Sequence, residues 1–154
     1  MQPAIDIAAL AHRKGTEIGV SRWFQLDQPK VNAFADLTED HQFIHVDPTR
    51  AAADSPFGGT IAHGFLTLSM LTAMSLDILP SIENTAVSIN YGFDRIRFLT
   101  PVPVGSRVRG RFTLTDLVDK GRNQHLATYA VSVEADGLAR PALAANWLIL
   151  TVLK

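Results

Sequence analysis

Hydrophobic and polar positions alternate through the second half of the chain. Runs rich in β-branched and aromatic residues are separated by short segments containing Pro, Gly and Asn, and they cover residues 87–98, 107–118, 126–135 and 143–153. Period-two alternation is typical of a sheet with one buried face and one wet face. The short connections predict an antiparallel meander, and a weaker run over 18–26 adds a fifth strand.

The first half of the chain carries helix signals instead. Asp27, with a proline two residues later, is a typical N-cap and predicts a helix over 28–38. Asp47 precedes another proline and predicts a short helix over 48–53. The residues between these two helices, and those over 54–59, follow neither period and are expected to form loops.

A long apolar stretch follows, with Thr60 as its expected N-cap and Pro80 as its end. Residues 61–79 contain no Lys or Arg and are numerous enough to cross a bilayer. They also contain His63, Asp77 and several Ser and Thr residues, which favours a helix buried in a globular core. We therefore expect no membrane span.

An apolar helix and a sheet large enough to curl can bury each other if the sheet wraps around the helix. This α+β arrangement is the hotdog fold, here with a curled antiparallel five-stranded sheet around one long helix. A generic α+β sandwich would satisfy the same burial. The chain shows no internal repeat and no linker, so residues 1–154 are expected to form a single domain.

Composition disfavours several function classes. The formal net charge of -1 provides no attraction to phosphate backbones, so nucleic acid is not an expected partner. The chain has no cysteine, hence no thiolate nucleophile and no Cys-ligated metal, which agrees with a reducing compartment. The N-terminus has no basic segment ahead of an apolar run, so we expect a cytoplasmic protein without a secretory signal.

The segment over 38–47 contains three carboxylates and two imidazoles, among them Asp40 and His45. A carboxylate raises the pKa of a nearby imidazole, and partial desolvation moves both groups toward their neutral forms. Such a pair can accept and donate a proton near neutral pH, as general acid–base chemistry requires. The alternative is that Asp40 is a solvated loop acid and His45 an ordinary half-buried ring.

A glycine-rich run, Phe-Gly-Gly-Thr-Ile-Ala-His-Gly over 57–64, leads into the apolar helix. The first N–H groups of a helix have no partner within it and lie at the positive end of its dipole, so they can hold an oxyanion. Gly64 has no Cβ, which would let a carbonyl approach its N–H closely. The alternative is that this glycine lets a strand pass over the helix.

Two longer runs, DHQFIHVDPTRAAADSPFGGTIAHGFLTLSML and INYGFDRIRFLTPVPVGSRVRG, combine these features. Together they resemble the MaoC-like (R)-specific enoyl-CoA hydratases, and within them the branch typified by nodulation protein N. The resemblance covers most of the chain, from about Gly19 onward. It implies a hotdog enzyme that adds water reversibly to a 2-enoyl-CoA thioester to give the (R)-3-hydroxyacyl thioester.

The resemblance also implies a role for each matching residue. Asp40 and His45 fall on the catalytic pair that activates one water for addition at C3, with proton delivery to C2, and Gly64 falls on the residue whose N–H polarises the thioester carbonyl. Thr72 falls where many members have a serine lining the site, although a buried Thr bonded to its own helix is an alternative. Further contacts with substrate are expected at Gln42, Phe57, Gly59, His63, Asn90 and Gly92.

Some of these assignments have competitors. Many hydratases have Asn-Pro where this chain has Gln42 and Phe43, so the acyl-chain preference stays open. Gly92 could instead mark a bend within its strand. The alternating arginines of the run over 107–111 could meet the phosphates of coenzyme A, but regularly spaced strand arginines more often form a solvated face.

No metal ligand set is expected, because no two histidines stand at i and i+4 on a predicted helix beside a carboxylate and hydration needs no Lewis acid. No cofactor is expected beyond the coenzyme A of the substrate, with acyl carrier protein as the alternative carrier. The runs over 87–98 and 143–153 are apolar enough for a homodimer interface. Two other functions stay open: a hotdog acyl-CoA thioesterase and a non-catalytic acyl-thioester binding protein.

Overall fold

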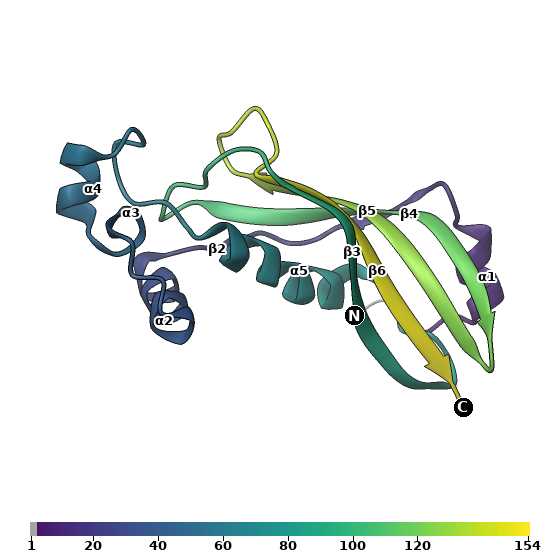
Figure 1. Ribbon diagram of the computed structural model, residues 1–154. Helices are drawn as coiled ribbons and strands as arrows, with labels where there is room; N and C mark the ends of the chain where they lie inside the picture. The colour runs from purple at the N-terminus through teal and green to yellow at the C-terminus, as the bar shows by residue number, and fades with distance from the viewer. Residues whose placement is uncertain (1–2) are drawn as a thin grey trace.

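The computed structural model describes residues 3–154 as an antiparallel sheet curled around one long helix (Figure 1). The helices are α1 (Ile7–His12), α2 (Gln28–Thr38), α3 (Phe43–Val46), α4 (Pro48–Asp54) and α5 (Gly64–Ile78). The strands are β1 (Glu17–Val20), β2 (Phe24–Gln25), β3 (Thr85–Phe98), β4 (Arg107–Gly121), β5 (Gln124–Ala135) and β6 (Leu143–Leu153). This α+β arrangement is the hotdog fold predicted from the sequence.

Neighbouring strands of the sheet run in the order β1-β4-β5-β6-β3, and β2 also pairs with β4. The four predicted later strands are confirmed. The early strand over 18–26 is instead split in two, because Ser21 forms two hydrogen bonds to Gly110, one through its N–H and one through its side-chain oxygen. The side-chain bond takes the place of a ladder bond and interrupts the strand.

Strand order also corrects the expected dimer interface. The run over 143–153 is β6, which lies between β5 and β3, so both of its edges are already paired. Of the two runs expected there, β3 alone stands at an end of the strand order, and β1 stands at the other end. A dimer that pairs strand edges could therefore not use β6.

Strand β4 shows the predicted alternation. Val108, Gly110 and Phe112 face the core, whereas the three arginines between and beside them face outward. Each arginine has a carboxylate partner: Arg107 pairs with Asp136, Arg109 with Glu134, and Arg111 with Glu17 and Glu134. These pairs support the solvated-face interpretation, since no charge is left over for a phosphate.

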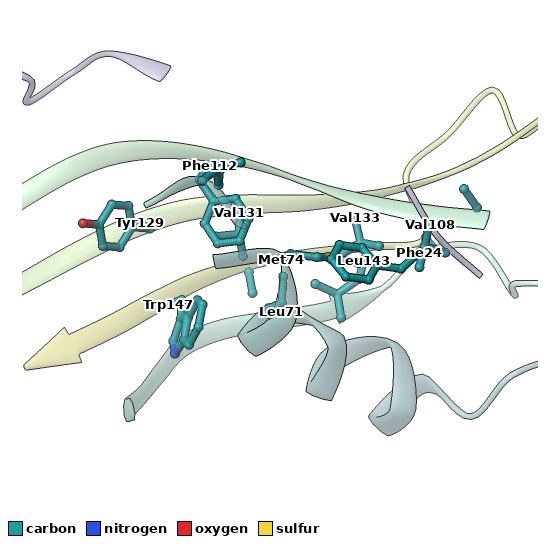
Figure 2. Close-up of a cluster of buried hydrophobic side chains, with 14 of the residues drawn as sticks. Phe24, Leu71, Met74, Val108, Phe112, Tyr129, Val131, Val133, Leu143 and Trp147 are labelled. Atoms are coloured by element: carbon teal, nitrogen blue, oxygen red, sulfur yellow. The ribbon is translucent and has the colours of Figure 1, made fainter. Parts of the chain in front are cut away.

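Helix α5 lies against the concave face of the sheet and supplies one side of the core (Figure 2). Its Leu71 and Met74 are almost fully buried and point toward the strand side chains. The helix passes so close to β4 that a Cβ at Gly110 would lie 2.9 Å from the Met74 sulfur. A glycine at this position lets the helix and the strand approach.

The start of α5 differs from the prediction. The helix begins at Gly64, and Thr60 does not cap it but donates a hydrogen bond from Oγ1 to the side chain of Gln28. The N–H groups of Ile61 and Ala62 donate to the carbonyls of Ile44 and Val102, which holds this stretch outside the helix. Bonds to distant segments thus set the helix start.

The small helices α2, α3 and α4 gather beyond the N-terminal end of α5 (Figure 1). The predicted N-caps of α2 and α4 are confirmed: Asp27 accepts from Lys30 N–H, and Asp47 accepts from Arg50 N–H. Helix α3 occupies part of a segment expected to be loop, and α1 was not predicted. Within residues 3–154, every helix is too short or too polar to span a bilayer.

Candidate active site at the head of the buried helix

A cavity of about 190 Å³ opens where α3, the head of α5 and the segment after β3 meet. Its wall is mainly apolar and includes one imidazole, that of His45, and one helix-start glycine, Gly64. The full lining is His45, Ile61, Ala62, Gly64, Thr67, Phe98, Leu99, Thr100, Pro101, Val102 and Ala142. Two of the three predicted catalytic residues therefore share one cavity.

His45 is held in one tautomer. The residue is only 7% exposed, and its Nδ1 lies 2.7 Å from the carbonyl oxygen of Ile61. A carbonyl can only accept, so Nδ1 carries the proton and donates it. In the neutral ring Nε2 then has a free lone pair, which is the form needed for a general base.

Asp40 lies close to this imidazole. A carboxylate oxygen of Asp40 and one ring nitrogen each of His45 and His63 all lie within 4.8 Å of one another. Asp40 is exposed, and its Oδ1 accepts weakly from the N–H of Gln42 at 3.4 Å. Hydrogen bonds to water are about 2.8 Å long, so a single water can touch both members of a pair at this separation.

The surroundings of His45 act on its pKa in opposite directions, and the balance lowers it from 6.5. Burial is the largest cause, and a charge on His63 acts the same way. The Ile61 carbonyl and the charge of Asp40 raise the pKa but do not prevail. The expected rise caused by the nearby carboxylate is therefore outweighed by desolvation, and the ring is neutral at pH 7.

Gly64 is the first residue of α5, and its N–H donates to no group within residues 3–154. The end of β3 passes directly over it: a Cβ here would lie 2.9 Å from the Phe98 ring. This contact supports the interpretation that the glycine lets a strand cross the helix. It also leaves the amide free at the cavity wall, where a carbonyl oxygen can reach it.

The same three side chains could be considered as ligands of a metal ion. The His45 and His63 rings, however, are stacked with centroids 3.8 Å apart and planes inclined by only 26°. A metal ion bonds in the plane of each imidazole at about 2 Å, and two planes so placed do not meet at that distance. One ring would have to turn before both could hold one ion.

The cavity includes none of the seven residues expected to contact substrate: Gln42, Phe57, Gly59, His63, Thr72, Asn90 and Gly92. Thr72 is exposed on α5, turned away from the buried Leu71. Leu71 is buried, and one further residue turns the helix by about 100°. Phe57 is likewise exposed, in the loop after α4.

The other residues of this set have roles within the protein. Gln42 is the N-cap of α3, and Asn90 accepts a hydrogen bond from the Trp147 indole at 2.7 Å. Gly92 has a φ of 144° at a shift in the β3–β6 register, which supports the strand-bend interpretation. His63 lies behind the cavity, against Asp40 and His45.

Sequence reasoning missed most of the cavity wall. Thr67 could have been predicted as part of the wall, because it stands three positions after Gly64 and so lies on the same side of the helix. Phe98 is the last residue of β3, Val102 lies in the segment after it, and Ala142 precedes β6. Nothing in the local sequence places those residues beside the head of α5.

Comparison with known proteins is consistent with this geometry. The family model described as "MaoC like domain" matches residues 10–136. The chain is 52% identical over 144 residues to nodulation protein N of Rhizobium leguminosarum bv. viciae, covering 94% of this chain and 89% of that protein. It is 46% identical over 144 residues to the 3-hydroxyacyl-thioester dehydratase Z of Mycobacterium tuberculosis, covering 94% of each.

Among solved structures, the chain is similar to the (R)-hydratase from A. caviae involved in PHA biosynthesis. The TM-score is 0.66 and the sequence identity 26%, and the match covers 88% of this chain and 97% of that one. The likeness extends over the sheet and the buried helix together.

The environment of His45 can be tested directly by NMR of the ring nitrogens during a pH titration. We expect Nδ1 to carry the proton in the neutral ring and the pKa to lie below 6.5, because burial disfavours the charged form. A pKa above 6.5, or a proton on Nε2 in the neutral ring, would contradict the described geometry. His45→Gln identifies the resonance.

Proposed function

Because this chain belongs to the MaoC-like domain family of hydratases and dehydratases, we propose that it adds water reversibly to the double bond of a 2-enoyl thioester. The observation that carries the proposal is the placing of three groups: the Asp40 carboxylate, a His45 ring nitrogen within 4.8 Å of it, and the N–H of Gly64, which lines one cavity with His45. The first two can hold one water, and the third can hold a carbonyl oxygen.

The reaction needs two proton movements. In our proposal the Asp40–His45 pair holds the water, takes a proton from it as the water oxygen bonds to C3, and delivers a proton to C2. The electron pair of the double bond moves toward the thioester carbonyl and returns to C2 when the proton arrives. The two groups titrate as a coupled pair, so the pair as a whole is assigned the transfer.

The thioester oxygen gains negative charge as the water adds. The Gly64 N–H stands at the positive end of the α5 dipole and has no partner in residues 3–154, so it can stabilise this charge. The apolar cavity wall strengthens that interaction because it excludes water. Hydration and the reverse dehydration use the same transition state.

The finer assignment follows the named relatives. We propose an (R)-3-hydroxyacyl product, which the similarity to the (R)-hydratase supports, and coenzyme A as carrier with acyl carrier protein as the alternative. The 3-hydroxyacyl-thioester dehydratase supports the thioester class. The chemistry assigned to Asp40, His45 and Gly64 requires neither a metal nor a redox cofactor. We propose the cytoplasm as the location.

We also propose that the protein forms a homodimer through the free edge of β3. This long strand exposes large apolar side chains, notably Val87, Ile89 and Tyr91, the last of them 61% exposed. A long apolar edge strand left in water tends to pair with another copy. A two-fold pairing of β3 with β3 would extend both sheets.

Incubation of the purified protein with crotonyl-CoA tests the reaction. We expect the enoyl absorbance to fall with no release of free thiol. Asp40→Asn and His45→Gln should each lower kcat by about a hundredfold or more, because each removes a proton-transfer partner. His12→Gln, on α1, is the matched control and should stay within about twofold.

Circular dichroism should show that all three variants remain folded. Thiol release in place of double-bond loss would instead indicate a thioesterase, and neither change across short and long enoyl chains would indicate a binding protein. Full activity in both Asp40→Asn and His45→Gln would remove the assignment of the pair.

The dimer is tested by light scattering after size-exclusion chromatography. We expect twice the mass of one chain at micromolar concentration, and the mass of one chain for Ile89→Lys, because like charges would face each other across the two-fold axis. Leu37→Lys, on the exposed face of α2, is the control and should stay dimeric. A wild-type protein of single-chain mass would contradict the proposal.

A further inference from the structure

His63 is a buried residue next to the proposed catalytic pair, and the mechanism leaves its chemistry unused. It is only 3% exposed, and it precedes α5 as the N-cap residue without forming a side-chain cap. It is not part of the cavity wall. A buried histidine that neither caps its helix nor faces the cavity needs another explanation.

Its contacts supply one. The His63 Nε2 lies 3.0 Å from the backbone carbonyl oxygen of Asp40, so Nε2–H donates there. The same ring is stacked on the His45 imidazole at 3.8 Å, and Phe34 of α2 packs against it at 5.1 Å. One side chain thus touches both members of the proposed catalytic pair.

These two contacts restrict different motions. The hydrogen bond ties the loop after α2, which carries the exposed Asp40, to the head of α5. The stacked ring limits the rotation of His45 about its side chain. Among the described residues, 3–154, the Asp40 carboxylate accepts only the weak 3.4 Å bond from Gln42 N–H, so the backbone contact with His63 is its firm link to the site.

We propose that His63 is a positioning residue, which holds the Asp40 loop by its Nε2–H and the His45 ring by stacking so that the two groups meet on one water. This inference rests on the proposed function. His63 acts through the other two residues and need not touch the substrate. Misplacement of a reacting group by about 1 Å is enough to cost a hundredfold in rate.

The charges around His45 allow a second readout. Within residues 3–154, Asp40 from the loop after α2 and His63 from the head of α5 are the titratable groups whose charge acts on it. Helix α2 presents the neutral amide of Gln28 to its backbone. On α4, the Asp47 carboxylate accepts the Arg50 N–H, and the Arg50 guanidinium lies over Phe43.

A charge on His63 lowers the pKa of His45, so its removal should raise that pKa. The unprotonated Nε2 is the active form, and activity is lost as the pH falls through this pKa. The acid limb of the kcat/KM profile should therefore move to higher pH when His63 is replaced by an uncharged residue. A residue that only filled space would leave the limb in place.

The experiment compares two replacements. His63→Phe keeps a ring against His45 but loses the donor to the Asp40 carbonyl, whereas His63→Gln keeps a donor and loses the ring. For crotonyl-CoA we expect His63→Phe to lower kcat by about tenfold to a hundredfold with KM within about threefold. His63→Gln should have a higher kcat than His63→Phe, and both variants should move the acid limb of the kcat/KM profile to higher pH. His12→Phe is the control.

Unchanged kcat and an unchanged acid limb in His63→Phe would overturn the inference. So would a lowered kcat with an unmoved limb and no recovery in His63→Gln, because that result describes packing alone. If the wild-type protein hydrates no enoyl thioester, the proposed function fails by itself. The His45 pKa, measured by NMR in both His63 variants, then tests the positioning role separately. A pKa no higher than in the wild-type protein would overturn that role.

Discussion

The site depends on a reciprocal contact between the α3 segment and the chain just ahead of the buried helix. Ile61 N–H donates to the carbonyl of Ile44, and the carbonyl of Ile61 accepts the Nδ1–H of the adjacent His45. The first bond keeps residue 61 out of the helix. The second fixes the tautomer of the imidazole. Together they place the free Nε2 beside the first free amide of α5.

Burial keeps the His45 ring in the neutral form that can act as a base. The cavity wall lowers the pKa of His45, so the ring is neutral and basic at pH 7 although a carboxylate lies nearby. The sheet holds α5 from one side, and the close approach at Gly110 and at Gly64 leaves the helix little room to shift. A rigid helix head is a suitable support for a group that must meet a developing charge.

The sequence predicted those features of the fold that depend on residues close together in the chain. The caps at Asp27 and Asp47, the alternation in β4 and the apolar length of α5 all lie within a few residues of the feature they specify. The start of α5 and the split at Ser21 depend on hydrogen bonds to distant segments, which no local pattern contains. The place of Thr72 in a motif does not fix its helix face, and the residue is exposed. The sequence likewise marked His63 but did not show which side of the cavity it occupies.

The central claim is that the thioester carbonyl binds at the Gly64 amide with the double bond facing Asp40 and His45. A crystal structure of the Asp40→Asn variant with crotonyl-CoA tests it most directly, since the substrate should persist there. We expect the thioester oxygen about 3 Å from the Gly64 nitrogen and C3 beside the Nε2 of His45. A carbonyl bound elsewhere, or a double bond turned away from His45, would contradict it.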